Sequence, residues 1–343
     1  MLPTSPRLPF TPDLTIHRLL NGLWQVSGGH GRIDPRAALP AMLALHAAGC
    51  TTWDLADHYG PAEDFIGEFR RQLSAARGAA ALAEVQAFTK WVPPPTRMTR
   101  RIVADAIAVS LRRMDTPALD LLQFHWWDYA YDQYLAALDF MLELRQAGQI
   151  KHLGLTNFDT PRLERILAHG IPIVSNQVQY SLIDRRPEVA MVPVCQERQV
   201  WLLTYGTLCG GLLTDEYLGQ PEPGRAALPT ASLQKYKQMI DAWGGWALFQ
   251  DLLRALRAIA DRHALAGGQA VSIANVATRY ILDKPTVAGV IVGVRLGLRD
   301  HQADNARVFG LSLNPADLAQ IESILSRAKD LYRLIGDCGD EYR

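Results

Sequence analysis

The sequence predicts a closed barrel of eight parallel β-strands surrounded by α-helices, the (β/α)8 or TIM barrel, in a single α/β domain. Short apolar runs alternate with amphipathic stretches almost from end to end, and this alternation predicts parallel strands joined by right-handed helical crossovers. Eight such units are present, the number that closes a barrel. An open doubly wound sheet would carry a G-x-G-x-x-G turn after its first strand, and the glycine-rich segment at 28–31 lacks that spacing.

The expected strands are short and rich in β-branched residues or leucine, as strands covered on both faces should be. They are placed at 18–25, 51–55, 84–89, 119–124, 151–156, 173–178, 200–204 and 288–292. Asp34 and Thr160 each precede a proline, the arrangement of a helix N-cap followed by the first helical position. The expected helices are placed at 34–49, 61–76, 99–114, 133–147, 160–169, 187–198 and 270–283.

Two segments are additional to the repeating strand–helix units of the barrel. The stretch between the seventh and eighth strands is long and rich in proline and glycine, which predicts a loop over the barrel mouth. An extra helix is expected at 246–264, and a C-terminal amphipathic helix at 314–329 precedes a polar tail at 337–343. The predicted organisation is an N-terminal extension at 1–14, the barrel at 15–330 and a C-terminal tail at 331–343.

Composition argues against several partner classes. The 35 Lys and Arg residues balance the 35 Asp and Glu residues, so no overall charge favours nucleic acid or an anionic membrane surface. The four cysteines are far apart and form no CxxC pair, which argues against a disulfide framework or a structural zinc site. Neither a secretory signal nor a membrane span of about eighteen apolar residues is recognisable, and we expect a cytoplasmic protein.

Polar side chains stand at the carboxyl ends of the predicted strands, where barrels carry their active sites. Any one of them has an ordinary structural explanation, such as an ion pair between Asp54 and Lys90 or a packed, hydrogen-bonded His125. Their position on consecutive strands at one rim instead predicts a shared site. The residues are Asp54, Lys90, His125, Asn157, Gln177 and Tyr205, with Tyr59 in the turn after the second strand.

The segments that contain these residues closely resemble the aldo-keto reductase superfamily. WDLADHYGPAE at 53–63 is similar to the family motif with the catalytic Asp and Tyr, FTK at 88–90 to the strand that ends in the catalytic Lys, and LDLLQFH at 119–125 to the strand that ends in the catalytic His. Further matches are GLTNF at 154–158 and SNQVQY at 175–180. The resemblance implies an NAD(P)H-dependent oxidoreductase that interconverts a small carbonyl compound and its alcohol.

Carbonyl reduction gives each of the four catalytic candidates a role. A carbonyl that accepts hydride develops negative charge on oxygen and needs a proton there, so Tyr59 is assigned as general acid. A tyrosine titrates near pH 10 in water, and the ammonium of Lys90 is expected to lower the pKa of Tyr59. Asp54 would keep Lys90 charged, and His125 would orient the carbonyl.

Hydride must come from a cofactor, and NADPH is expected, with NADH as the alternative. The resemblance implies that Asn157 and Gln177 hold the nicotinamide carboxamide and that Tyr205 stacks on the ring. The family's Ser-Pro-Leu after this tyrosine is replaced by Gly-Thr-Leu, so a pyrophosphate contact is assigned to Thr207 or to backbone amides near Gly210. The complete expected cofactor set is Gly22, Trp24, Asn157, Gln177, Tyr205, Thr207, Leu208, Gly210, Gly293, Arg295, Arg299, His301 and Asn305.

The adenosine end of the cofactor is expected after the eighth strand, where a helix near 300–309 offers its N-terminus to a phosphate. Asn305 matches the family's adenine-contacting Asn, and His301 stands four positions before it. Arg295 and Arg299 are assigned to a 2′-phosphate because a guanidinium makes bidentate contacts with phosphate. NADP is therefore preferred over NAD.

Trp24, Trp91 and Trp126 are predicted to line the substrate site, because aromatic walls suit an apolar or sugar-like carbonyl compound. Of the adjacent residues Trp126 and Trp127, only one can face inward. The identity of the substrate, the physiological direction and the number of subunits stay open.

Three alternatives also stay open at this point. The chain could be a cofactor-binding regulatory subunit of the potassium-channel β type with slow turnover, or an NAD-linked sugar or pyridoxal dehydrogenase. The third is a phosphate-sugar aldolase that uses Lys90 as a Schiff base, although the combination of Asp54, Tyr59, Lys90 and His125 argues against it.

Overall fold

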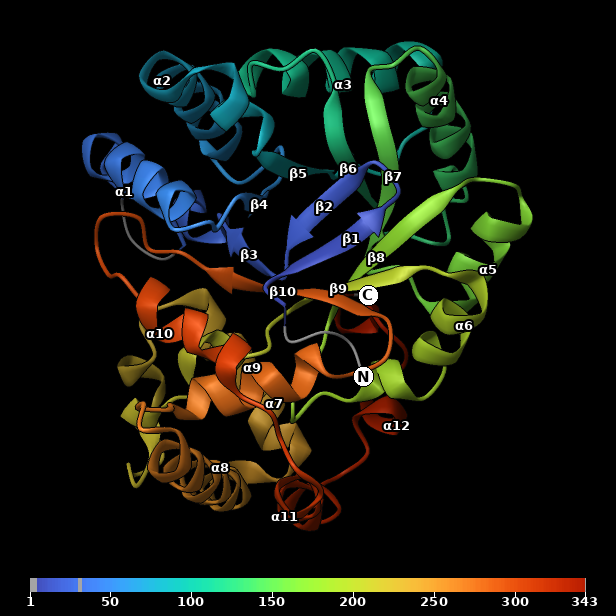
Figure 1. Cartoon of the computed structure of the whole chain (residues 1–343). Coiled ribbons are helices and arrows are strands. Elements are labelled where there is room, and N and C mark those ends of the chain that lie inside the picture. Colours follow the sequence, from blue (N-terminus) through green and yellow to red (C-terminus); the bar gives the residue numbers. More distant parts are fainter. Residues whose placement is uncertain (1–4, 30–32, 343) are drawn as a thin grey trace.

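The computed structural model describes residues 5–29 and 33–342, and it contains the predicted barrel (Figure 1). Eight parallel strands close in the order β10-β3-β4-β5-β6-β7-β8-β9. Each overlaps a predicted strand, so the predicted fold class is confirmed. The strands are β3 (Leu19–Gly22), β4 (Thr52–Asp54), β5 (Gln86–Trp91), β6 (Leu119–His125), β7 (Ile150–Thr156), β8 (Ile173–Gln179), β9 (Trp201–Tyr205) and β10 (Val287–Gly293).

Helices surround this barrel (Figure 1). α1 (Pro35–Ala47) begins as predicted, because the Asp34 side chain accepts a hydrogen bond from the Arg36 amide. α5 (Thr160–Ala168) is capped one residue earlier than predicted, by Asp159. The other helices that follow strands are α2 (Ala62–Ala83), α3 (Arg100–Arg113), α4 (Tyr134–Gln146), α6 (Met191–Arg198) and α9 (Ile273–Leu282). None of the helices in the described ranges combines the length and the apolar character needed to cross a membrane.

The stretch between β9 and β10 contains one more helix than the predicted loop, extra helix at 246–264 and barrel helix at 270–283. The expected extra helix is α8 (Gly245–Gly267), and a further helix, α7 (Ala231–Trp243), lies inside the segment predicted as loop. The Thr230 side chain caps α7. The prolines and glycines before it suggested a loop, although the residues buried by α7 have helical spacing: Tyr236, Met239, Ile240 and Trp243.

Three short helices follow β10. The helix expected near 300–309 is α10 (Gln302–Ala306), which continues into a 3-10 turn. The predicted C-terminal helix is α11 (Pro315–Leu325), and α12 (Leu331–Ile335) was not predicted. A last 3-10 turn, Asp340–Tyr342, belongs to the segment that was expected to be a polar tail; residue 343 of that tail lies outside the described ranges.

An N-terminal hairpin, β1 (Arg7–Thr11) and β2 (Leu14–His17), crosses one end of the barrel (Figure 1). Its apolar side chains pack into the barrel interior and close the floor. They are Leu8, Phe10, Leu14 and Ile16, which form one cluster with Leu20, Phe88, Leu121, Leu203 and Ala288 of the strands. The boundary expected after residue 14 falls inside β2 and therefore divides the hairpin. The first four residues of the expected extension at 1–14 lie outside the described ranges.

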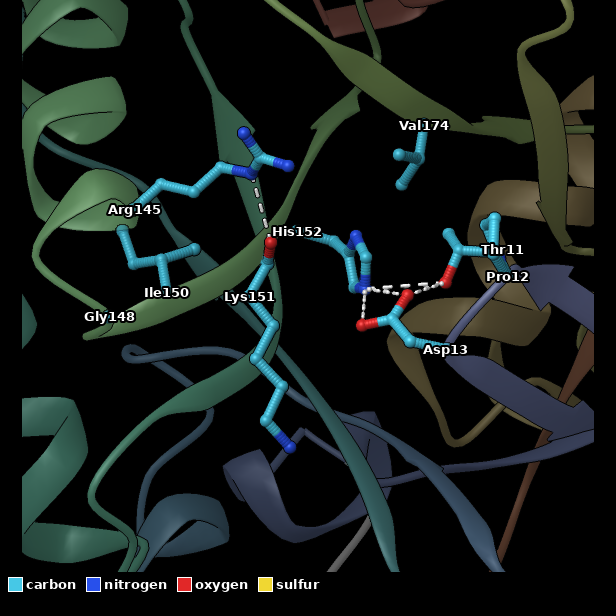
Figure 2. Close-up of a pocket in the computed structure, with 9 residues that line it drawn as sticks. All are labelled: Thr11, Pro12, Asp13, Arg145, Gly148, Ile150, Lys151, His152 and Val174. Carbon is cyan, nitrogen blue, oxygen red and sulfur yellow. Dashed lines mark hydrogen bonds and ion pairs between the residues drawn. The ribbon is translucent and has the colours of Figure 1, made fainter.

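A cavity of about 590 Å³ lies at this floor, beside the hairpin turn (Figure 2). His152 at the start of β7 points toward the turn, with Nε2 3.1 Å from Asp13 Oδ1 and 3.3 Å from Thr11 Oγ1. Arg145 donates to the carbonyl of Lys151 at 3.0 Å. The catalytic candidates lie at the opposite ends of the strands, so this cavity is separate from the candidate active site.

Candidate active site

Four polar side chains form a buried layer between the apolar floor and the barrel mouth. Lys90 Nζ lies 2.7 Å from Asp54 Oδ2 and donates to the carbonyl of Leu55 at 2.9 Å. The two charged side chains are only 3% and 4% exposed. Gln123 and Gln177 donate to Asp54 Oδ1 at 2.9 and 2.7 Å. Asp54 therefore accepts from three donors, which compensates a buried charge that would otherwise be costly.

Gln123 is a member of this layer that the sequence analysis missed. It is fully buried, and its Oε1 accepts from Gln177 Nε2 at 2.7 Å. The signal was present in the sequence, because Gln123 stands two residues before His125 on an otherwise mostly apolar strand. Residues two apart on a strand point to the same face, so Gln123 had to share the barrel interior with His125.

Tyr59 lies in the turn after β4, beside the layer. Its ring centroid is 5.0 Å from Lys90 Nζ, and the Trp24 ring meets it edge-on at 4.8 Å. Burial raises the pKa of Tyr59 well above its ordinary value, and the carboxylate of Asp54 raises it further. The expected net lowering of this pKa is wrong for the structure, because burial and the Asp54 carboxylate raise it. Burial also lowers the pKa of Lys90, against the opposing effect of Asp54.

Strand alternation decides which tryptophans face the mouth. Trp91 follows the inward-facing Lys90, and it is buried in the outer core. Trp126 follows the inward-facing His125 and is also fully buried in that core. The structure thus places both residues away from the substrate site to which they were assigned. Trp127 takes the position expected of Trp126: it is partly exposed, and its ring contacts the His125 ring at a tilt of 34° with centroids 4.3 Å apart.

The three residues expected to hold a nicotinamide lie at or near the carboxyl ends of β7, β8 and β9. The Tyr205 hydroxyl donates to Asn157 Oδ1 at 2.8 Å. Asn157 has a left-handed backbone, with φ of 56°, a conformation that asparagine tolerates better than most residues. The amide nitrogen of Gln177 is bound to Asp54 and Gln123. The structure therefore brings Asn157 and Tyr205 together and draws Gln177 into the buried layer.

The turn after β9 corrects one cofactor assignment. Thr207 is 2% exposed, and its hydroxyl donates to the carbonyl of Tyr180 at 2.9 Å. It is therefore a packed residue and is not accessible to a pyrophosphate. Leu208 is half-buried, whereas Gly210 is exposed and has a positive φ of 68°.

The residues assigned to the adenosine end share the wall of one cavity of about 690 Å³, which runs between α1 and the segment after β10. This volume is within the range of small-molecule sites. Gly22 and Gly293 are partners across the β3–β10 seam, where a Cβ on Gly22 would lie 2.8 Å from Ile291 Cγ2. The assigned residues on the cavity wall are Gly293, Arg295, Arg299, His301 and Asn305.

The C-terminal segment reaches into the barrel mouth, where only a polar tail was expected. The Tyr342 hydroxyl lies 3.2 Å from that of Tyr205. The Tyr342 ring meets Trp127 edge-on at 5.6 Å and His125 at 6.3 Å. Lys235 of α7 donates to the same hydroxyl at 2.5 Å. The Tyr342 phenol therefore occupies space next to the catalytic candidates.

A buried ion-pair network holds this segment in place. Arg186, in the loop after β8, lies 2.8 Å from Asp184 Oδ1 and 3.0 Å from Glu341 Oε2. All three side chains are at most 5% exposed. Asp337 Oδ2 also accepts from the Thr160 amide at 2.7 Å. Such contacts join residues far apart in the sequence, so no local pattern could predict them.

Comparison with known families agrees with this architecture. The Aldo/keto reductase family model matches residues 18–326. The chain belongs to the aldo/keto reductase family. The family indicated by the sequence motifs is thereby confirmed, and this aldo/keto reductase is an oxidoreductase of the class that reduces carbonyls with NAD(P)H.

Relatives of this aldo/keto reductase share most of its length. It is 26% identical over 313 residues to aldo-keto reductase YhdN of Bacillus subtilis, covering 89% of this chain and 88% of that protein. It is 21% identical over 327 residues to the NADH-specific methylglyoxal reductase of Escherichia coli, covering 90% and 94%. The crystal structure of the aldo/keto reductase from Klebsiella pneumoniae with NADP and acetate aligns at a TM-score of 0.68 and 21% identity, covering 94% of this chain and 95% of that one. This likeness shows a shared fold.

Proposed function

We propose that the chain reduces an aldehyde or ketone to the alcohol with hydride from NAD(P)H, and that Tyr59 donates the proton. The observation that carries this proposal is the buried Asp54–Lys90 pair at 2.7 Å, with the Tyr59 ring 5.0 Å from Lys90 Nζ. His125 ends β6, the strand next to the one that carries Lys90. A bound cofactor would supply hydride to the carbonyl carbon, and the side chains of this site serve the carbonyl oxygen.

Tyr59 is suited to give a proton rather than to take one. Because its pKa is raised by burial and by Asp54, the phenol keeps its proton in the resting state. A carbonyl oxygen becomes strongly basic as the carbon accepts hydride, so proton transfer from Tyr59 becomes favourable at that stage. Lys90 then lies close to the phenolate and stabilises it. The resting protonation state of Tyr59 is therefore the one that carbonyl reduction requires.

His125 is proposed to orient the carbonyl. Its ring is held by a tilted contact with the Trp127 ring, with centroids 4.3 Å apart, and by its place at the end of β6. A hydrogen bond from an imidazole N–H to the carbonyl oxygen would polarise the substrate and direct the oxygen toward Tyr59.

Two groups of residues fit the two ends of the proposed cofactor. Asn157 offers an amide and Tyr205 an aromatic ring at the mouth, which suits a nicotinamide with its carboxamide. Arg295 and Arg299 lie on the cavity wall assigned to the adenosine end, which suits a 2′-phosphate. One relative is named as NADH-specific, so the proposed preference for NADPH depends on these two arginines and not on family membership.

The aldolase alternative loses support from the contacts of Lys90. Its Nζ donates to Asp54 and to the carbonyl of Leu55, which stabilises the ammonium form. A Schiff base requires a neutral amine with free access to the substrate. The fully buried pair therefore favours proton chemistry at Tyr59 over amine chemistry at Lys90.

The test is a fluorescence titration with NADPH and NADH, followed by steady-state assays of a panel of aldehydes and ketones. We expect tighter binding of NADPH and stoichiometric conversion of aldehyde to alcohol as the dihydronicotinamide absorbance falls. Tight cofactor binding without turnover of any carbonyl would instead favour the regulatory-subunit alternative. Absence of binding by either cofactor would contradict the proposed function.

A further inference from the structure

Lys235 is a cation at the barrel mouth whose neighbours are tyrosines. Its Nζ lies 4.2 Å from the ring centroid of Tyr342 and 5.4 Å from those of Tyr205 and Tyr236. It donates to the Tyr342 hydroxyl at 2.5 Å. Within residues 5–29 and 33–342, no Asp or Glu carboxylate forms an ion pair with Lys235. The side chain is half-buried, so solvent shields its charge only in part.

Other charges nearby already have partners. Lys237, two positions further along α7, forms ion pairs with Glu222 and Asp241, each at 2.6 Å. Glu341 adjoins Tyr342; its Oε2 is paired with the buried Arg186 at 3.0 Å, and its Oε1 accepts from the Tyr205 hydroxyl at 3.3 Å. A partly desolvated cation surrounded by aromatic rings and a neutral hydroxyl gains from an anionic ligand, because a charge-assisted hydrogen bond is stronger than a neutral one.

One aromatic ring separates Lys235 from the catalytic candidates. The Tyr342 phenol has its hydroxyl on Lys235, while its ring lies 6.3 Å from the His125 ring and 5.6 Å from the Trp127 ring. The segment therefore places an aromatic ring with a polar substituent near both the cation and the imidazole. A ligand of the same size would put its own polar substituent on Lys235 and its other end near His125.

We propose, on the basis of the proposed function, that the preferred substrates are carbonyl compounds of about one aromatic ring that carry an anionic group, and that Lys235 binds this group. The substrate takes the position of the Tyr342 phenol, which swings out of the mouth. A carboxylate binds Lys235 more strongly than the phenol hydroxyl does. An anionic substrate therefore displaces Tyr342 more readily than a neutral substrate of the same shape.

The probes are 4-carboxybenzaldehyde and its neutral methyl ester, methyl 4-formylbenzoate. In each reaction the aldehyde carbon gains hydride from NADPH and its oxygen gains a proton, which gives the benzyl alcohol and NADP⁺. Lys235→Met removes the charge and retains an apolar stem, Lys235→Arg retains a charge, and Lys237→Met is the matched control on the same helix. Comparing the acid/ester ratio of kcat/KM between variants cancels the intrinsic reactivity of the two aldehydes.

We expect Lys235→Met to lower this acid/ester ratio by about ten- to a hundredfold, the range for a lost charge-assisted contact. The loss should lie mainly in the KM of the acid. Lys235→Arg should retain most of the preference, and Lys237→Met should leave the ratio unchanged. Added salt should weaken binding of the acid and leave the ester unaffected.

An acid/ester ratio that Lys235→Met leaves unchanged would overturn this inference while the proposed function stands. If the wild-type protein reduces neither aldehyde, the proposed function has failed for aromatic aldehydes of this type. Titration calorimetry then tests the anion site at Lys235 separately. The ligand is then 4-(hydroxymethyl)benzoate, titrated with and without NADP⁺. Binding that is lost in Lys235→Met and kept in Lys237→Met would support the anion site. Equal affinity in both variants, or no binding to the wild type, would overturn it.

Discussion

At the scale of single residues, the carboxylate of Asp54 holds the buried layer together. It accepts hydrogen bonds from Lys90, Gln123 and Gln177. Removal of one donor leaves a buried charge with fewer partners, which costs more free energy than an isolated pair contributes. Burial raises the pKa of the neighbouring Tyr59, and the Asp54 carboxylate raises it further.

Replacement of Tyr59 by Phe tests the proton donor. Phenylalanine keeps the ring that contacts Trp24 and Lys90 and removes only the hydroxyl. We expect kcat to fall by about 10²–10⁴-fold, the usual contribution of a general acid, with the Kd for NADPH nearly unchanged. Stopped-flow measurement of hydride transfer should show this loss directly. A variant that keeps more than about a hundredth of the wild-type rate would assign the proton to another group.

Arg295 and Arg299 differ in their surroundings, and this difference predicts different roles in cofactor choice. Arg295 is half-buried on the cavity wall, whereas Arg299 is exposed and lies 3.8 Å from Glu216. We expect Arg295→Ala to weaken NADPH binding by about ten- to a hundredfold and Arg299→Ala to weaken it less. NADH binding should change little in either variant, since NADH lacks the 2′-phosphate. Equal losses for both cofactors would show that Arg295 contacts a part common to NADH and NADPH.

At the scale of elements, the segment between β9 and α7 is the part of the mouth with the least regular structure. It contains only three short 3-10 turns, at Cys209–Gly211, Asp215–Tyr217 and Arg225–Ala227. Arg299 connects it to the cavity of the proposed adenosine site through an exposed ion pair with Glu216, and such pairs are weak. The segment is therefore positioned to change its order when a cofactor binds.

Hydrogen exchange tests this expectation. We expect amides of residues 214–230 to exchange fast without cofactor and to become protected when NADPH is added. Amides of α7 serve as the internal control, because its buried face keeps the helix packed in both states. Equal protection of 214–230 with and without NADPH would mean that this segment does not close over the cofactor.

We expect the free energy of unfolding to depend on pH through His152, which contacts the turn of the floor hairpin. Burial lowers the pKa of His152 below its ordinary value of 6.5, and Arg145 lowers it further, while the carboxylates of Asp13 and Asp120 oppose the shift. A histidine with a lowered pKa in the folded state contributes its full stability above pH 6.5. That contribution is lost as the pH falls from 6.5 toward the folded-state pKa, because the unfolded chain binds the proton more tightly.

Urea unfolding of the wild type and of His152→Gln at pH 8 and at pH 5.5 checks this dependence. The wild type should lose more free energy of unfolding between the two pH values than the variant loses. Retained NADPH affinity at pH 8 would confirm that the variant leaves the mouth intact, since His152 lies at the opposite end of the barrel. An identical pH dependence of the two proteins would exclude His152 as the titrating group.

At the scale of the whole molecule, the sequence predicts the features that local patterns determine. Short apolar runs predicted all eight barrel strands, and the strand ends located Asp54, Lys90 and His125 at one rim. A stricter use of alternation would also have selected Gln123 and Trp127, which have the same parity as His125. These omissions were errors of interpretation, because the necessary pattern was present.

Other features depend on contacts that no local pattern encodes. Tyr342 enters the mouth because Arg186 holds Glu341 across a large separation in the sequence. Lys235 lies among the rings of Tyr205, Tyr236 and Tyr342 because α7 packs over the same mouth. The pKa of Tyr59 likewise depends on burial by the assembled barrel and on the charge balance between Asp54 and Lys90. Tertiary packing sets all three properties.

The β3–β10 seam has a consequence for how the protein folds. It pairs 19–22 with 290–293, so a chain in which only this pairing has not formed presents an open eight-stranded sheet with two unpaired edges, β3 and β10. Such edges can pair with those of another molecule, and long-range pairing is slow enough to allow this. We expect the refolding yield, measured by NADPH binding, to fall as the protein concentration rises, while native protein stays monodisperse at the same concentrations. A yield independent of concentration would indicate that the barrel closes before the free edges can meet.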